Sequence, residues 1–123
     1  MLTQIETAIE QARADLGDAL VAVDVWASGN GLSYASFETR STTGPMLNAV
    51  THDLRVAAAA GGNELDDLYV LDLNGRTAVV VVCPPRLEAA LIVDTSAADL
   101  DHLLTETVPA FAQALRSAQD DQA

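Results

Sequence analysis

One dipeptide, Asn74-Gly75, restricts the fold of this chain more than any other feature of its sequence. A type I′ turn needs positive φ at both central residues, and Asn followed by Gly adopts that geometry at low cost. The flanking segments, residues 65–73 and 76–83, are rich in apolar residues, so the sequence predicts a β-hairpin. Residues 79–82 are four consecutive valines. Both faces of that strand must therefore be covered, which predicts a sheet with helices on both sides.

Hydrophobic periodicity and turn residues divide the rest of the chain into helices and strands. Apolar residues at helical spacing predict a helix over residues 3–16, which Thr3 and Glu6 would cap and Gly17 would end. Two strands are expected over residues 19–26 and 32–38, around the Ser28-Gly29-Asn30-Gly31 turn. A helix should follow, which begins at one of the N-cap candidates Ser41, Thr42 and Thr43 and ends at Gly61-Gly62. After the hairpin, a strand over residues 87–94 and a last helix complete the chain.

Side-chain spacing also predicts which residues face inward. Along the first strand, alternation puts Val21, Val23 and Val25 on one face and Leu20, Ala22 and Trp26 on the other. The last helix is expected to open at Ser96 and Asp99 and to bend at Pro109. Its apolar positions are Leu100, Leu104, Val108, Phe111 and Leu115. The polar residues 117–123 predict an unstructured tail, so the folded domain is expected to span residues 1–116.

The order of these elements, α-β-β-α-β-β-β-α, predicts the fold class. Its strands follow one another through tight hairpins rather than long crossovers, so the five-stranded sheet should be antiparallel. Helices on both faces make the expected architecture a three-layer α/β/α sandwich of the α+β type.

The charge of the chain excludes several functions. It has 18 Asp and Glu against 6 Lys and Arg, a net charge of -12, and all six cations are arginines. Absence of lysine excludes Walker-type phosphate loops and Schiff-base enzymes. An acidic surface repels nucleic acids and anionic membranes, so neither is an expected partner. The single cysteine and the lack of a secretion signal or of an apolar run of about 18 residues predict a cytoplasmic protein.

Few residues have the arrangement that catalysis or metal binding requires. His52 and His102 have no metal-ligand neighbours at a recognised spacing, and no serine has a histidine at the spacing of a catalytic triad. Cys83 ends an apolar strand and is expected to be a buried structural thiol. Trp26 and Tyr34 are explained by cross-strand packing. The sequence therefore predicts no catalytic residue, no metal and no cofactor.

The second helix is apolar over more of its circumference than one sheet face can bury. Its two apolar stripes contain Leu47, Val50, Leu54, Ala57 and Ala58, and Met46, Ala49, Val56 and Ala60, and leave a narrow polar strip of Asn48, His52 and Arg55. Part of this helix is therefore expected to contact another chain, the alternative being burial within one chain.

A second apolar segment, residues 68–71, is apolar on both faces and can lie at a sheet edge, where a partner strand can pair with it. Asp66, Asp67 and Asp72 around it are interpreted as solvated charges of that edge. The expected interface with a partner consists of Met46, Ala49, Val50, Asp53, Val56, Ala57, Ala60, Leu68, Tyr69, Val70 and Leu71.

Over residues 2–115 the chain resembles the roadblock/dynein light chain family and, among bacterial proteins, its MglB-like branch. The resemblance lies in the order and length of the elements, in Gly31-Leu32-Ser33-Tyr34-Ala35 after a turn, and in the run from Tyr69 to Gly75. It implies a roadblock/profilin-like fold with the middle helix on one sheet face and the terminal helices on the other. It also implies homodimers in which the middle helices pack together and the third strands join two sheets.

Members of that family bind Ras-like small GTPases through the dimer platform, as activators or scaffolds, without supplying a catalytic side chain. The resemblance therefore implies a non-catalytic homodimeric regulator that binds a small GTPase and either stimulates its GTP hydrolysis or serves as a scaffold. The alternative is an acidic dimer like a secretion chaperone that binds client segments, although such chaperones place three strands before the middle helix and two after it. An enzyme would require a pocket of convergent polar groups, such as His52, Cys83 and an Asp together.

Overall fold

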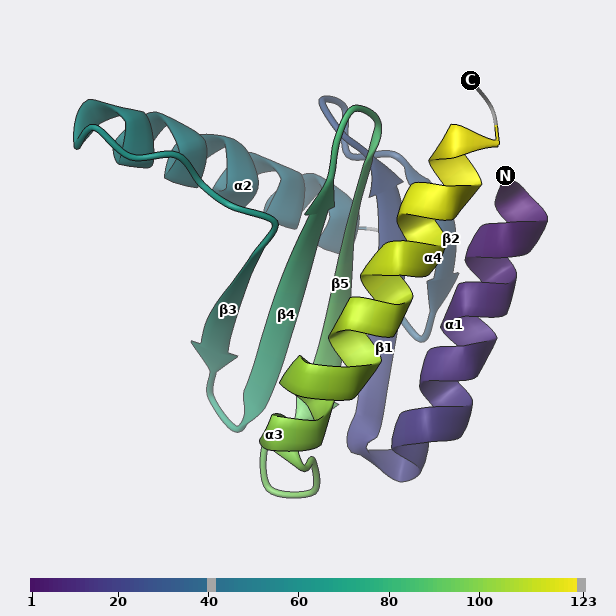
Figure 1. The fold of residues 1–123 in the computed structure, drawn as a ribbon. Helices are drawn as coiled ribbons and strands as arrows, with labels where there is room; N and C mark the ends of the chain where they lie inside the picture. The colour runs from purple at the N-terminus through teal and green to yellow at the C-terminus, as the bar shows by residue number, and fades with distance from the viewer. Residues whose placement is uncertain (40–41, 122–123) are drawn as a thin grey trace.

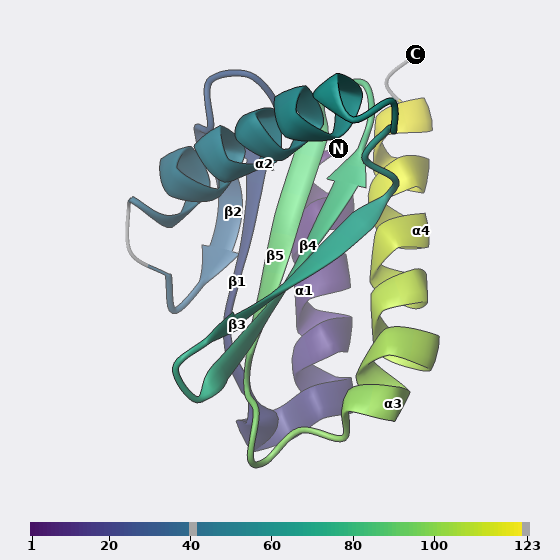
Figure 2. The ribbon, with the colours of Figure 1, turned by 90° about the vertical axis from the view of Figure 1, so that its left-hand side faces the viewer.

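Two helices cover one face of a five-stranded sheet and a third helix crosses the other face (Figures 1 and 2). The computed structural model describes residues 1–39 and 42–121. The elements are α1 (Leu2–Leu16), β1 (Leu20–Ala27), β2 (Ser33–Phe37), α2 (Thr43–Ala60), β3 (Leu68–Leu73), β4 (Arg76–Cys83), β5 (Leu87–Asp94), α3 (Leu100–His102) and α4 (Val108–Asp120), with a 3-10 turn at Gly17–Ala19 and a π-helical turn at Leu103–Thr107.

The sheet has the strand order β2-β1-β5-β4-β3, and every neighbouring pair is antiparallel. The predicted three-layer architecture and order of elements are therefore confirmed. The hairpin prediction is also confirmed, because Asn74 and Gly75 both have positive φ, 48° and 86°, and join β3 to β4.

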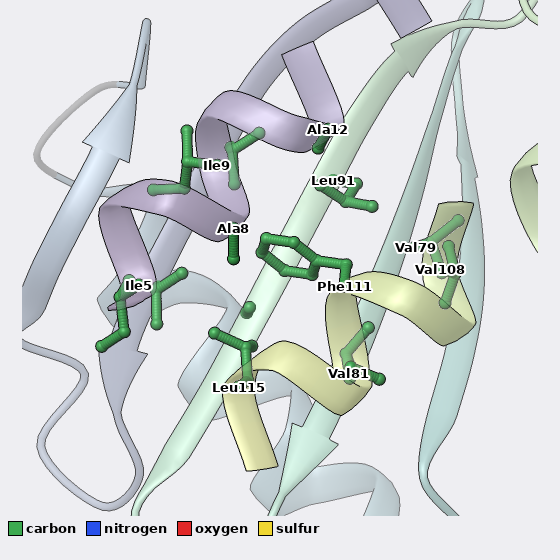
Figure 3. Close-up of a cluster of buried hydrophobic side chains, with 14 of the residues drawn as sticks. Ile5, Ala8, Ile9, Ala12, Val79, Val81, Leu91, Val108, Phe111 and Leu115 are labelled. Carbon is green, nitrogen blue, oxygen red and sulfur yellow. The ribbon is translucent and has the colours of Figure 1, made fainter. Parts of the chain in front are cut away.

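The core has two parts, one on each face of the sheet. The larger part lies between the sheet and α1 and α4, where residues such as Ile5, Leu91 and Phe111 pack together (Figure 3). The smaller part lies under α2 and consists of Trp26, Leu47, Val80 and Ala90. Strand β4 contributes valines to both parts, which confirms that its two faces are covered.

The predicted facing of the first strand is wrong at Leu20. Its side chain packs with Val23 and Val25 in the larger part of the core, whereas Trp26 lies on the α2 side as expected. The pairing of β1 with β5 shifts register between Leu20 and Ala22. Such an irregularity moves one residue to the opposite face of the strand, and periodicity alone does not reveal it.

Two predicted helix starts are also wrong. Helix α1 begins at Leu2, so Thr3 lies inside it, and no side chain caps its first turn. The last helical segment begins at Leu100 with Asp99 as its N-cap, whose carboxylate accepts a hydrogen bond from the His102 N–H (3.1 Å), whereas Ser96 is bonded to Asp94. Thr3 and Ser96 are residue types that often cap helices, but tertiary contacts determine where each of these two helices begins.

The predictions from turn and cap residues agree better with the structure at the C-terminal end of α1 and at the two ends of α2. Gly17 ends α1 with a φ of 56°, as predicted. Thr42 is the N-cap of α2 without a side-chain bond, and the candidate Ser41 lies outside the described residues. Of the two glycines at the C-terminal end, only Gly62 has positive φ.

The inward positions of the last helix are confirmed at Val108, Phe111 and Leu115, but they differ from the prediction before Val108, where a π-turn interrupts the helix. Leu100 and Leu104 are exposed, whereas Leu103 and Thr107 are buried. The Val108 N–H donates to the carbonyl of Leu103, five residues back. A turn wider than an α-turn rotates the preceding residues relative to α4. The predicted bend was placed at Pro109, whereas the interruption that the structure has is the π-turn at Leu103–Thr107, before Pro109.

The predicted unstructured tail is wrong as far as Asp120, where α4 ends. Gln119 is buried at the end of β4, and its side-chain amide donates to the carbonyl of Cys83 (2.9 Å) and accepts from the Arg86 N–H (2.9 Å). These bonds attach the C-terminal turn of α4 to the β4–β5 connection. Residues 122–123 of the predicted tail lie outside the described residues.

Candidate protein-interaction surface

Helix α2 leaves most of its apolar surface exposed. Its buried residues are Gly44, Leu47 and Thr51, whereas Met46 and Val56 are 52% and 57% exposed. Figure 1 shows the C-terminal end of α2 extending beyond β3, past the edge of the sheet. The single chain therefore covers only the side of this helix that faces the sheet.

The helix residues predicted to contact a partner lie together on the outward side of α2. We call this surface the α2 platform. Its members are Met46, Ala49, Val50, Asp53, Val56, Ala57 and Ala60. Val50 is half-buried and the others are exposed. Thr51 was not singled out in the sequence, yet it is buried and its hydroxyl bonds to the Leu47 carbonyl (2.8 Å) and to the Tyr69 hydroxyl (2.7 Å).

The four predicted interface residues of β3 divide between its two faces. Leu68 and Val70 are 43% and 46% exposed and pair with β4 residues that face α1 and α4. Tyr69 and Leu71 are half-buried and pack against the cluster under α2. Burial raises the pKa of Tyr69. Strand β3 lies at one edge of the sheet, so its outer backbone groups face away from β4.

A buried carboxylate holds the N-terminal end of α2 against the sheet. Asp24 in β1 accepts a hydrogen bond from the Ser33 hydroxyl (2.6 Å). Burial raises the pKa of Asp24, and hydrogen bonds from Ser33 and from the backbone N–H groups of Val25 and Gly44 oppose that shift. The N-terminus of a helix favours a negative charge. The Thr42 side chain makes no capping hydrogen bond to the first turn of α2, and the Asp24 carboxylate accepts one from the Gly44 N–H. A lone Asp within an apolar strand was the only sequence signal for this role.

The polar strip of α2 contacts the turns at one end of the sheet. The Asn48 side chain donates to the Gly29 carbonyl (2.9 Å) and accepts from the Gly29 N–H (3.2 Å). Arg55 lies near the buried carboxylate of Glu88 in β5, with Nη2 3.9 Å from Oε2. These polar residues therefore position α2 and leave its apolar side facing outward.

A polar cluster on the opposite face of the sheet was missed in the sequence. Asp15 at the end of α1 accepts hydrogen bonds from the Thr107 hydroxyl and from His102 Nε2, which lies 3.0 Å from Oδ1. The hydrogen bond from Thr107 lowers the pKa of Asp15, and the hydrogen bond from His102 lowers it further by a smaller amount. The hydrogen bond and charge of Asp15 raise the pKa of His102. Asp15 lies 87 residues from His102 and 92 from Thr107 in the chain, so their spacing gives no signal.

We expect this cluster to make stability depend on pH. The raised pKa of His102 means that its contribution is complete below the ordinary value of 6.5 and is lost as the pH rises through the raised value. Asp15 acts in the opposite sense, because its contribution is lost only as the pH falls below the ordinary value of 3.8. Urea midpoints measured between about pH 5 and 8 should therefore fall with rising pH in the wild type.

His102→Gln should flatten that fall, and His52→Gln, on the exposed side of α2, should keep it. A wild-type profile that rises across this range, or a His102→Gln profile that matches the wild type, would contradict the assignment.

The residues that an enzyme would need do not converge. His52 is exposed on α2, whereas Cys83 belongs to the core on the other face of the sheet, where burial raises its pKa to about 11. Within residues 1–39 and 42–121, no three His, Cys, Asp or Glu residues lie where they could hold a metal ion. No helix in the same part of the chain is long and apolar enough to cross a membrane.

The fold has close counterparts among solved structures. No family model and no curated protein sequence matches the chain. MglB of Myxococcus xanthus is 11% identical and superimposes with a TM-score of 0.85, covering 99% of this chain and 92% of that protein. A structure described as MglB with a tetrameric arrangement is 15% identical, with a TM-score of 0.78 and coverages of 98% and 93%.

A roadblock/LC7 domain from Streptomyces avermitilis is 13% identical to the chain, with a TM-score of 0.59 and coverages of 85% and 86%. At these identities the likeness concerns the fold. The MglB-like roadblock/profilin fold predicted from the sequence is therefore confirmed.

Proposed function

We propose that this chain, which shares its fold with MglB and a roadblock/LC7 domain, is a non-catalytic homodimeric regulator that binds a Ras-like small GTPase. In the dimer, the α2 platforms of two copies pack together and their β3 edges meet. The GTPase docks on the paired helices, and the dimer serves it as a scaffold or stimulates its GTP hydrolysis.

The exposure of the α2 platform is the observation that carries this proposal. Met46 and Val56 are more than half exposed on a helix whose opposite side is anchored through Asp24, Asn48 and Leu47. Large apolar side chains gathered on one side of a rigid helix are typical of interaction surfaces. Alanines beside them on the platform, such as Ala49 and Ala60, allow a second helix to approach closely.

The edge strand supports the same mode of association. Leu68 and Val70 are exposed beside the free edge of β3, and an apolar edge is stabilised when a second strand pairs with it. The helix and the edge strand together offer a second copy both side-chain and backbone contacts. A protein of known fold described with a tetrameric arrangement indicates that this fold can form assemblies.

The order of the strands argues against the secretion-chaperone alternative. Two strands precede α2 and three follow it, the reverse of the arrangement expected for such chaperones. Client binding is therefore not the function that this topology favours.

The GTPase proposal is tested by co-elution. The purified chain is mixed at micromolar concentration with Ras-like small GTPases encoded near its gene, each loaded with GDP or a GTP analogue, and run on a sizing column with light scattering. We expect one GTPase to bind. Met46→Glu, on the platform and outside any polar pocket wall, should weaken binding at least about tenfold, a loss of about 1.4 kcal/mol.

Leu104→Glu is the matched control, because Leu104 is exposed on the π-turn, away from α2. Light scattering on the same column separates loss of the GTPase from loss of the dimer. GTP hydrolysis measured with and without the chain distinguishes an activator from a scaffold. No association with any small GTPase at these concentrations would contradict the proposal.

A further inference from the structure

We propose that a hollow beside α2 binds one arginine side chain of a partner protein. The hollow has a volume of about 430 Å³ and opens to the surface between α2, the β1–β2 turn and the start of β5. Its walls include Ser28, Asn48, His52, Asp53, Arg55 and Glu88. It lies along the polar strip of α2 and shares Ala49 and Asp53 with the α2 platform.

The buried charged group in the wall of this hollow is Glu88, which is 1% exposed. One carboxylate oxygen accepts from the Trp26 indole N–H (2.9 Å) and the other from the Ser28 hydroxyl (3.0 Å). Both donors are neutral. A carboxylate has about four acceptor positions, so Glu88 can accept further hydrogen bonds.

The nearest cation does not complete this site. Arg55 Nη2 is 3.9 Å from Glu88 Oε2, within reach of electrostatic attraction but beyond a hydrogen bond, and the Arg55 side chain is 43% exposed. A buried carboxylate is well stabilised only when its charge is paired at hydrogen-bond distance. Glu88 therefore favours a second, better-placed cation in the hollow.

The remaining charges favour a cation over an anion. Asp53 and Glu88 line the hollow against a single Arg55, and the chain as a whole carries a charge of -12. A field of that sign raises the local concentration of positively charged groups. A guanidinium is planar, donates to carboxylates from several N–H groups and is less strongly hydrated than an ammonium, so it suits a site walled by a buried carboxylate.

The inference rests on the proposed function only for the identity of the partner. If a GTPase docks on α2, an arginine side chain on the surface of the GTPase binds in the hollow. The site itself follows from the geometry of Glu88 and can be tested without any protein partner.

Trp26 gives a direct measurement, because it is the only tryptophan and its indole N–H is bonded to Glu88. Its indole signal in ¹H–¹⁵N NMR spectra is followed while ethylguanidinium, a model of the arginine head group, is added to the intact protein. We expect a saturable shift with a millimolar dissociation constant, and none with the neutral isostere ethylurea.

Two variants test the role of the charges. Glu88→Gln keeps an oxygen that can accept from Trp26 and should abolish the saturable shift. Arg55→Gln changes an exposed side chain and should tighten ethylguanidinium binding severalfold, because a competing guanidinium is removed. This second variant keeps the test decisive even if Glu88→Gln fails to fold.

Equal shifts with ethylurea, a saturable shift that persists in folded Glu88→Gln, or weaker binding by Arg55→Gln would each overturn the inference. The outcomes are separate from those of the co-elution test. A GTPase that binds while ethylguanidinium does not would overturn this inference alone, and the reverse result would overturn the proposed function alone.

Discussion

Val56→Asp is expected to convert the proposed dimer into monomers, raising its dissociation constant by at least about 100-fold. Val56 is exposed on the α2 platform and would be buried against the second copy. A twofold interface contains each residue twice, so one substitution introduces two unpaired carboxylates into the contact. Burying such charges costs far more than the about 2.8 kcal/mol that a 100-fold change represents. Sedimentation equilibrium over a wide range of concentrations measures the change.

Leu104→Asp provides the matched control, since it places the same charge on another exposed leucine, away from α2. This variant should keep the wild-type association constant. A wild type that is monomeric at all concentrations, or a Val56→Asp protein that associates as strongly as the wild type, would remove the basis of the proposed dimer.

Gly44→Ala is expected to destabilise the fold by about 3 kcal/mol, because there is no room for a methyl group. A Cβ at Gly44 would lie 2.6 Å from the backbone oxygen of Gly31 and 3.2 Å from the carboxylate of Asp24. The Gly31 oxygen is a backbone atom, and hydrogen bonds from Ser33 and from backbone N–H groups hold the Asp24 carboxylate, so neither can easily move aside. The first turn of α2 must therefore shift away from β1. Thermal unfolding should show a midpoint lower by about 12 °C.

Gly61→Ala, at the other end of the same helix, is the control. Its φ of -89° suits any residue, and an added Cβ would meet no neighbour closer than 3.6 Å. This variant should unfold within about 0.5 kcal/mol of the wild type. If Gly44→Ala unfolded at the wild-type midpoint, the close approach of α2 to the β1–β2 turn would not be a constraint on the fold.

The sequence predicted the parts of this fold that local patterns determine. Asn74-Gly75 required a hairpin because few other dipeptides adopt two positive φ angles, and the valines of β4 required cover on both faces because no other arrangement buries them. The breadth of the apolar surface on α2 was also visible, since it exceeds what one sheet face can contact.

The features that the sequence did not reveal depend on contacts between distant segments. The end of α1 lies beside the π-turn, and only this packing brings Asp15 to His102 and Thr107. Likewise, Asp24 contacts the start of α2 only because α2 packs against the β1–β2 hairpin. Because of the π-turn, Leu103 and not Leu104 faces the core. A prediction from α-helical periodicity assumes a constant value of about 3.6 residues per turn and so does not include this rotation.

The two edges of the sheet differ in a way that limits how far association can proceed. Strand β3 offers exposed apolar residues, whereas β2 at the other edge has five residues, among them Ser33 and Ser36, and Arg13 lies over the ring of Phe37, 4.1 Å from its centroid. Two copies joined through β3 would present only these short β2 edges, and an edge strand of five residues is a poor template for another strand. Growth would stop at a closed pair instead of continuing into a fibre.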